Sequence, residues 1–326
     1  MFDSPVKTDV HLRYALERDV FINADNIEEV LRIARVRKGS RSVIGLRVNP
    51  QIGSASIAET FVASASSKFG VPLGERRKEV LETFKEFGFL SCVHVHVGSQ
   101  GVELPALIQG LEEGVKLACE INERVGKKQV TTIDIGGGLP VDYHSDNLDP
   151  TFEAYGALLR EMLPRLFEFR IVTEFGRKLV AKAGWAAAKV QYVKKAGGRK
   201  IALTHAGADV FMRPVYQRDK WYHRLDVYDA QGREKVSERV GKSKIDIGGP
   251  LCFSGDLLAI DRELSNMEAG DWMVVRDAGA YTLAMHNRHT SQLVPSVYGY
   301  EESAPSNLVT MKKTETLEEL IRYWGG

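Results

Sequence analysis

The chain has 326 residues, of which 44% are hydrophobic and 27% charged, a composition typical of an ordinary globular protein. A net charge of +1 gives no reason to expect nucleic acid or a membrane surface as a partner, and no apolar run is long enough to span a bilayer. The three cysteines form neither a metal-binding spacing nor a disulfide framework, and we expect no metal. We expect a cytoplasmic protein, with a plastid as the alternative if a targeting segment is missing.

The first half of the chain alternates between short apolar strands and amphipathic helices. Strands are predicted at 2–4, 20–23, 42–49, 91–97, 131–135 and 170–173, and helices at 8–18, 26–35, 76–87, 104–125 and 152–169. Residues 53–70, rich in serine and alanine, are predicted to form a loop. This alternation is typical of a parallel α/β sheet, in which ligands bind at the carboxyl ends of the strands.

The pattern changes after about Lys182. Short strands separated by turns are predicted at 186–195, 200–203, 224–228, 245–247, 272–276 and 293–298. The chain is polar from Glu301 onward and ends in a predicted helix at 317–323. We therefore predict two domains, an α/β domain over 1–182 and an antiparallel β domain over 183–326.

Three glycines follow the predicted strand at 131–135. Gly136, Gly137 and Gly138 have no Cβ, so their backbone N–H groups can approach a phosphate closely. The alternative is a tight turn that needs positive φ angles. The run matches neither the dinucleotide spacing nor the P-loop.

Two histidines lie at the end of the predicted strand at 91–97. Alternation places His94 and His96 on the same face. They could ligate a metal with a third ligand that the local sequence does not supply, or they could be one packed and one surface histidine. A third interpretation is a flat imidazole stacked on an aromatic cofactor, with Ser99 donating to its phosphate.

Three further positions carry chemistry. Glu174 could be a metal ligand, a base, a partner for a ring nitrogen, or a structural ion-pair partner of Arg177. Cys252 lies in a turn-rich stretch and could be a chemically active thiol. The alternative interpretation is a buried cysteine that acts as a small hydrophobe. Tyr281 follows a predicted strand and offers a phenol to a phosphate or a substrate.

Seven short motifs together resemble the fold type III decarboxylases that depend on pyridoxal 5'-phosphate (PLP), a family that includes diaminopimelate and ornithine decarboxylases. In chain order they lie at 67–70, 96–99, 134–138, 174–177, 213–214, 249–252 and 277–281. The resemblance implies a PLP-binding (β/α)8 TIM barrel of the alanine racemase-like type, followed by an antiparallel β domain. It also implies a homodimer with shared active sites.

The resemblance assigns a role to each site residue. His96 would stack on the pyridine ring, Glu174 would face the ring nitrogen, and Cys252 of the partner subunit would manage the proton step. Arg213 would bind a substrate carboxylate, with Tyr216 and Phe253 beside it. The phosphate would be held by Ser99, Gly136, Gly137, Gly138, Arg177 and Tyr281, and Gly176 would also belong to the cofactor site.

The chain also departs from the family pattern near the substrate. Phe253 stands where diaminopimelate decarboxylases carry a glutamate, Tyr216 comes one position before the expected tyrosine, and His205 replaces an aspartate. An aromatic residue at position 253 removes a charge and narrows the pocket. We expect a PLP-dependent decarboxylase of a polar or basic amino acid and do not favour meso-diaminopimelate.

The lysine that binds PLP in the family lies on the first barrel strand, upstream of the segment that 2–4 resembles. We therefore expect an incomplete chain that lacks the first two strands. Lys7 and Lys68 lie near predicted strand ends, and neither matches the family's lysine. The alternative to an enzyme is a non-catalytic homologue that acts as a regulatory or partner-binding protein.

Overall fold

The computed structural model describes residues 1–52, 56–57 and 60–326, and these form two compact units. Unit 1 comprises Met1–Asp142 and Asn147–Leu179. Unit 2 comprises Val180–Gly326 together with Tyr143–Asp146, a short segment that the predicted boundary at 182 did not assign to it. Each unit is described by itself.

Unit 1 is built on one parallel sheet with the strand order β1-β2-β3-β5-β6-β7, to which β4 is added by pairing with β3. Apart from the short strand β4, successive strands along the chain are neighbours in the sheet, as expected for right-handed crossovers through helices. The strands are β1 (Phe2–Asp3), β2 (Ile22–Ala24), β3 (Ile44–Asn49), β4 (Val71–Pro72), β5 (Leu90–Val95), β6 (Thr132–Asp134) and β7 (Arg170–Val172).

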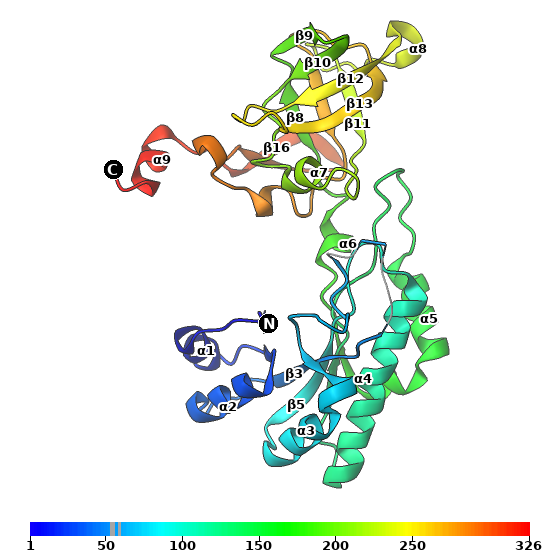
Figure 1. The fold of residues 1–326 in the computed structure, drawn as a ribbon, viewed down its shortest axis with the longest axis vertical. Coiled ribbons are helices and arrows are strands. Elements are labelled where there is room, and N and C mark those ends of the chain that lie inside the picture. Colours follow the sequence, from blue (N-terminus) through cyan, green and yellow to red (C-terminus); the bar gives the residue numbers. More distant parts are fainter. Residues whose placement is uncertain (53–55, 58–59) are drawn as a thin grey trace. The chain divides into compact units, whose positions relative to one another are not determined.

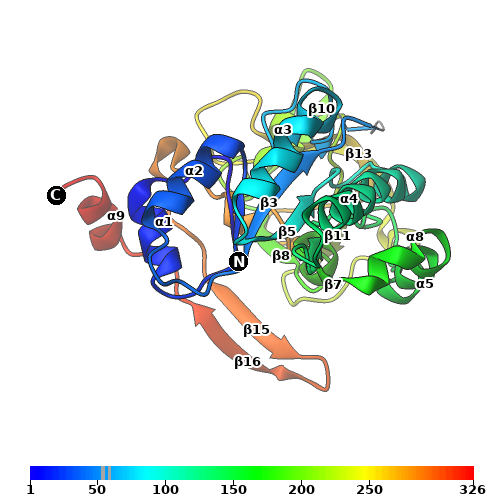
Figure 2. The same ribbon diagram turned by 90° about the horizontal axis from the view of Figure 1, so that it is seen from below.

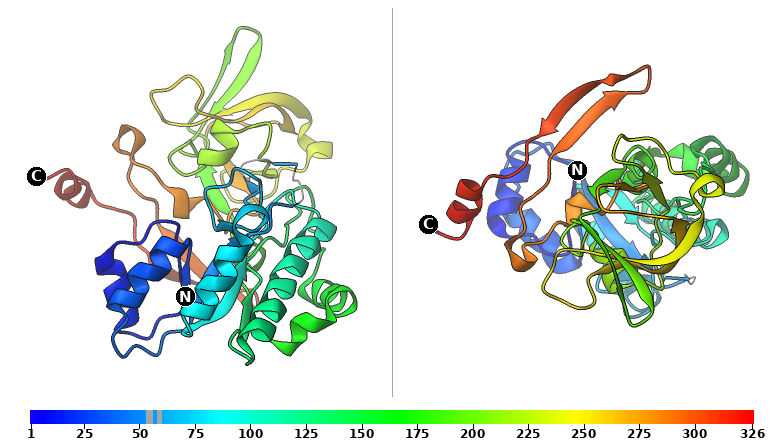
Figure 3. Two further views of the ribbon diagram at one scale, coloured as in Figure 1. Left: turned by 60° about the horizontal axis from the view of Figure 1, so that its bottom comes forward. Right: turned by 90° about the horizontal axis from the view of Figure 1, so that it is seen from above.

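Helices connect these strands, and α1 lies beside α2 while α3 lies beside α4 (Figures 1 and 3). The helix α4 packs its small Gly110 and Gly114 against valines of the β5 segment. Among the described residues, no helix is long and apolar enough to cross a membrane. The helices are α1 (Asp9–Leu16), α2 (Ile27–Val36), α3 (Leu73–Glu86), α4 (Leu104–Val125), α5 (Phe152–Met162) and α6 (Gly176–Val180).

The two faces of the sheet differ in chemistry. One row across β3, β5 and β6 consists of Leu46, Val93 and Ile133, all fully buried. The next row, which points to the opposite face, consists of Arg47, His94 and Asp134 and is also buried. Burying charged groups is unfavourable unless they have partners, so the polar face is the candidate for a functional site.

Most elements of unit 1 were predicted correctly. The helix at 104–125 is confirmed to the residue, and Asn26 caps α2 by accepting from the Glu29 N–H. The helix predicted over 152–169 is wrong in its second part, because Pro164 lacks an N–H and a 3₁₀ turn, Pro164–Glu168, follows α5. Of the predicted loop at 53–70, residues 53–55 and 58–59 lie outside the described residues.

Unit 2 contains a four-stranded sheet in the order β13-β12-β10-β9, a three-stranded sheet in the order β11-β14-β8, and the hairpin β15–β16, a long ribbon in Figure 2. Three short helices, α7 (Met212–Tyr216), α8 (Ser237–Val240) and α9 (Leu317–Tyr323), complete it. The strands are β8 (Ala186–Lys189), β9 (Tyr192–Ala196), β10 (Arg199–Leu203), β11 (Leu225–Tyr228), β12 (Lys242–Gly248), β13 (Leu257–Ser265), β14 (Trp272–Val275), β15 (Val297–Glu301) and β16 (Ala304–Lys312).

The prediction for unit 2 needs three corrections. Its sheets are not purely antiparallel, because β10 and β12 pair in parallel. The single strand predicted at 186–195 is two strands that belong to different sheets. The strands β13 and β16 were not predicted: charges at 261–263 and a register shift interrupt the alternation of β13, and β16 is a largely exposed strand.

Candidate active site

The carboxyl ends of β5, β6 and β7 bring six predicted residues of unit 1 together. The Arg177 guanidinium donates to Ser99 Oγ at 3.3 Å, and the Gly137 N–H donates to His96 Nδ1 at 2.9 Å. The Glu174 N–H donates to the Gly136 carbonyl at 2.8 Å. The three strand ends are therefore joined to one another by hydrogen bonds.

The glycine run is a turn that has no room for side chains. Gly136 and Gly138 have φ angles of +63° and +112°, which favour glycine. A Cβ on Gly137 would lie 2.7 Å from the Glu174 carbonyl oxygen, and one on Gly138 would lie 2.7 Å from the Gly98 carbonyl oxygen. The positive φ angles that the alternative required are confirmed, and phosphate binding by the N–H groups of the run stays a prediction.

His96 is held as a neutral, flat ring. Burial, and then the charge of Arg47, lower the pKa of His96 to about 3. Its Nδ1 accepts from the Gly137 N–H, so the ring proton is on Nε2. Its side chain is 20% exposed, whereas His94, on the same strand face as predicted, is fully buried. An uncharged, partly exposed imidazole suits stacking on an aromatic ring.

Glu174 is a carboxyl group between the two histidines. Its Oε1 lies 3.9 Å from His94 Nε2, and its Oε2 lies 4.0 Å from His96 Nδ1. Burial, and then the nearby carboxylates of Asp134 and Asp3, raise the pKa of Glu174 to about 8. Such a group is protonated at neutral pH unless a cation or a donor faces it.

The substitution Glu174→Gln is expected to flatten the pH dependence of stability. Because the folded pKa lies near 8 and the ordinary value is 4.5, the folded protein retains a proton between these pH values that the unfolded chain has lost. The free energy of unfolding therefore falls as pH rises through this window, and glutamine removes this contribution. Urea unfolding at pH 5.5, 7.0 and 8.5 checks it, with the exposed Glu153→Gln as control. Equal slopes for wild type and Glu174→Gln would contradict it.

Lys7 lies near a strand end, but its amino group is not available to bind PLP. Its amino group donates to the Ser4 and Asn23 carbonyls, both at 2.7 Å, and to Glu29 Oε2 at 2.8 Å. All three donors of the ammonium are used and the side chain is fully buried, so Lys7 is a structural residue. Lys68 is exposed and its amino group lies 5.0 Å from the Phe69 ring centroid.

The predicted substrate residues of unit 2 also come together in pairs. The Arg213 guanidinium lies over the ring of Tyr281, 4.4 Å from its centroid. Tyr216 stacks on Phe253 with a centroid distance of 5.6 Å, and its hydroxyl lies 3.3 Å from His289 Nδ1. Sequence reasoning missed His289, since it lies 73 residues after Tyr216 and no motif contains it.

Cys252 is exposed, so its interpretation as a buried small hydrophobe is wrong. It lies in the loop between β12 and β13, which the buried Asp256 shapes. Asp256 accepts from the Leu251 N–H at 2.8 Å and from the Ala208 N–H at 2.7 Å. The loop thus presents the thiol to solvent on a fixed backbone.

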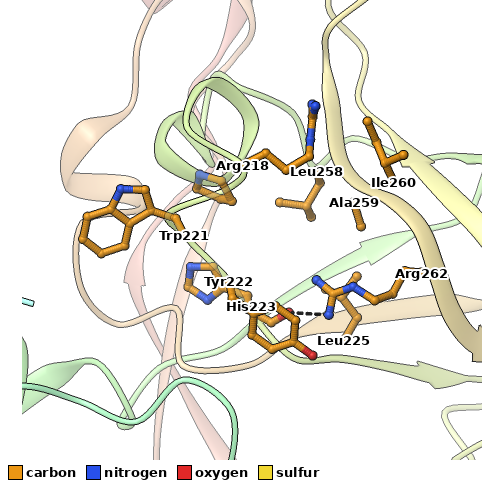
Figure 4. Close-up of a pocket in the computed structure, with 10 residues that line it drawn as sticks. Arg218, Trp221, Tyr222, His223, Leu225, Leu258, Ala259, Ile260 and Arg262 are labelled. Carbon is orange, nitrogen blue, oxygen red and sulfur yellow. Dashed lines mark hydrogen bonds between the residues drawn. The ribbon is translucent and has the colours of Figure 1, made fainter. Parts of the chain in front are cut away.

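A small pocket lies elsewhere in unit 2 (Figure 4). It is bordered by Arg218, Trp221, Tyr222 and Arg262, and the Arg262 guanidinium donates to the His223 carbonyl at 3.3 Å. None of the predicted site residues lines it, although Trp221 also contacts Arg213. It therefore does not replace the strand ends of unit 1 as the candidate site.

A parallel α/β sheet whose strand ends present a glycine turn, a serine, an arginine, a neutral histidine and a half-buried glutamate has the donor set that a PLP-binding barrel needs. Residues 1–181 match the family model described as "Pyridoxal-dependent decarboxylase, pyridoxal binding domain". The chain therefore belongs to the pyridoxal-dependent decarboxylase family. The predicted family and the PLP cofactor are confirmed.

Diaminopimelate decarboxylases are among the similar proteins. That of Aquifex aeolicus is 29% identical over 87% of this chain and 66% of its own length, and that of Zymomonas mobilis is 28% identical over 99% and 74%. A crystal structure of the Helicobacter pylori enzyme with L-lysine has a TM-score of 0.84 and 27% identity, covering 98% of this chain and 77% of that one. The predicted fold class is confirmed by this likeness. The chain thus spans about two thirds to three quarters of the length of these relatives.

Proposed function

We propose that the protein is a PLP-dependent decarboxylase of a polar or basic amino acid. The observation that carries the proposal is the meeting of His96, Glu174 and Arg177 with the glycine turn at three neighbouring strand ends of unit 1.

Each residue has a physical task in this proposal. Ser99, Arg177 and the Gly138 N–H hold the phosphate, since the Gly136 and Gly137 N–H groups already donate to Asp134 and His96. Neutral His96 provides a flat surface for the ring. When bound, PLP acts as an electron sink for the charge that develops as CO2 leaves. Glu174 faces the ring nitrogen and, as a carboxylate, stabilises a proton on that atom.

Unit 2 supplies the substrate residues. Arg213, fixed over Tyr281, binds a carboxylate, and the exposed thiol of Cys252 is a proton donor. Phe253, which stacks on Tyr216, stands where diaminopimelate decarboxylases carry a glutamate that contacts the distal polar end of the substrate. The relatives include diaminopimelate decarboxylases, and three of the similar solved structures are complexes with L-lysine. For this chain we propose only the substrate class, an amino acid with a second polar group, and not a particular substrate.

We also propose a homodimer with shared active sites and a cytoplasmic location. The homodimer follows from the resemblance, in which the cysteine of one subunit serves the site of the other. The three cysteines are free, which agrees with a reducing compartment. The comparisons give no support to the alternative of a non-catalytic homologue.

Arg177→Ala is expected to weaken PLP binding by about 10–100-fold, because hydrogen bonds from a charged donor contribute about 1.5–3 kcal/mol. Arg177→Lys keeps the charge but not the planar fork, so an intermediate loss is expected. The measurement is a PLP titration followed by absorbance, with Arg41→Ala, whose side chain is 88% exposed, as the control.

The same titration decides the proposal. A wild-type protein that does not bind PLP would refute it. If PLP binds, CO2 release is measured with meso-diaminopimelate, L-lysine, L-ornithine and L-arginine. Release from none of these, with PLP bound, would favour the non-catalytic alternative.

A further inference from the structure

Asp3, His94 and Glu174 form a row of polar side chains in unit 1 whose facing atoms make no hydrogen bonds among the described residues. His94 Nε2 is 3.9 Å from Glu174 Oε1, and His94 Nδ1 is 4.0 Å from Asp3 Oδ1. All four atoms are buried, and none has a hydrogen-bond partner among the described residues. Each gap is about 1 Å longer than a hydrogen bond, so small shifts of the side chains would close both.

Such atoms are costly to leave unpaired, which calls for an explanation of the row. The three residues come from β1, from β5 and from the segment after β7, so the chain does not place them together by local sequence. We infer that His94 is a positioning residue that binds Glu174 Oε1 through Nε2, with Asp3 fixing the ring through Nδ1. Glu174 Oε2 is then left to face the cofactor ring. This inference rests on the proposed function and adds a residue that supports Glu174.

The proton positions follow from the neighbours of Asp3. Arg47 donates to Asp3 Oδ2 at 3.2 Å, which leaves Oδ1 as an acceptor toward His94. A neutral imidazole has one N–H and one lone pair, so Nδ1–H faces Asp3 and the Nε2 lone pair faces Glu174. Glu174 then donates a proton from Oε1, which agrees with its raised pKa.

The charged groups around His94 decide when it is neutral. Burial, and then Arg47, His96 and Lys7, lower its pKa well below the ordinary value. Asp3, Asp134 and Glu174 face it from β1, β6 and the segment after β7. Without PLP, therefore, His94 is neutral and Glu174 holds the proton on Oε1.

The test uses two substitutions, each of which keeps a polar group at the position of one of the two ring nitrogens. The amide of Gln reaches the position of Nε2, and the amide of Asn reaches that of Nδ1. We expect His94→Gln to bind PLP within about threefold of wild type and His94→Asn to bind about tenfold more weakly. The control is Cys92→Ala, a buried residue on the same face of β5. Equal PLP affinities of the Gln and Asn variants would overturn the inference.

A second readout does not depend on PLP. Nitrogen NMR of the ¹⁵N-histidine-labelled protein, with His94→Asn to assign the signal, is expected to show the neutral Nδ1–H form without PLP. Asp3→Ala is expected to abolish this preference, and an Nε2–H form in wild type would overturn the inference. Failure of wild type to bind PLP would refute the proposed function but leave this readout standing. Tight Zn²⁺ binding lost in His94→Asn would also overturn it, because the three side chains would then serve a metal.

Discussion

Replacing Glu29 by alanine is expected to destabilise the protein by about 3–5 kcal/mol, because it leaves the ammonium of Lys7 buried without its counter-charge. The Lys7 and Glu29 side chains are 0% and 4% exposed, and Glu29 Oε2 accepts from both the Lys7 amino group and the Asp25 N–H at 2.8 Å. Glu29→Gln keeps an acceptor for both donors, so its loss should be smaller.

Urea unfolding followed by far-UV circular dichroism measures this effect, since α1–α5 all belong to unit 1. The four tryptophans, Trp185, Trp221, Trp272 and Trp324, all lie in unit 2, so their fluorescence follows the other unit separately. Lys116→Ala, which removes two exposed ion pairs, is the control and should change stability by less than about 1 kcal/mol. If Glu29→Ala lowered the free energy of unfolding as little as the control does, another group would have to balance the charge of Lys7.

Gly279→Ala is expected to destabilise unit 2 by at least about 3 kcal/mol, the upper range for overpacked positions. A Cβ at this position would overlap the Val180 carbonyl oxygen and lie 2.8 Å from the carbonyl carbon. Both atoms are backbone, and the Gly279 N–H already donates to the Ala181 carbonyl at 3.0 Å. The segment therefore has no flexible side chain that could move aside.

Tryptophan fluorescence during urea unfolding is the measurement for Gly279→Ala. The control is Gly156→Ala in the interior of α5, where an added Cβ meets nothing within 4 Å. Because it lies in unit 1, it should leave the tryptophan transition unchanged and stabilise the helix by about 0.5–1 kcal/mol in the circular dichroism transition. A fluorescence transition unchanged from wild type would mean that the backbone near Val180 can relax.

Local patterns predicted the α/β half of the molecule well because its strands and helices are contiguous and periodic. The alternation of β5 placed His94 and His96 on one face, and the glycines marked the turn beside them. Alternation gives the face of a residue but not its neighbours. Asp3 lies on a strand of only two residues, and it comes close to His94 because of the order of the strands in the sheet. Local sequence patterns do not reveal that order.

The same limit explains the errors in the second half. The contact of Tyr216 with Phe253 and the splitting of 186–195 between two sheets depend on which strands pair across long stretches of chain. The burial of Lys7 was also beyond local reasoning, because its partners Asn23 and Glu29 come from the following strand and helix. The resemblance to a known family supplied roles for residues that periodicity alone left open.

The pairing order of the strands has a consequence for synthesis on the ribosome. In unit 1, each of β2, β3, β5, β6 and β7 can join a neighbour that has already emerged. In unit 2, β8 and β11 both pair only with β14, which begins at Trp272. A nascent chain that has not yet reached Val275 therefore holds two strands without their common partner, and the loops between them close only late. The order of translation thus favours completion of the cofactor-binding unit first.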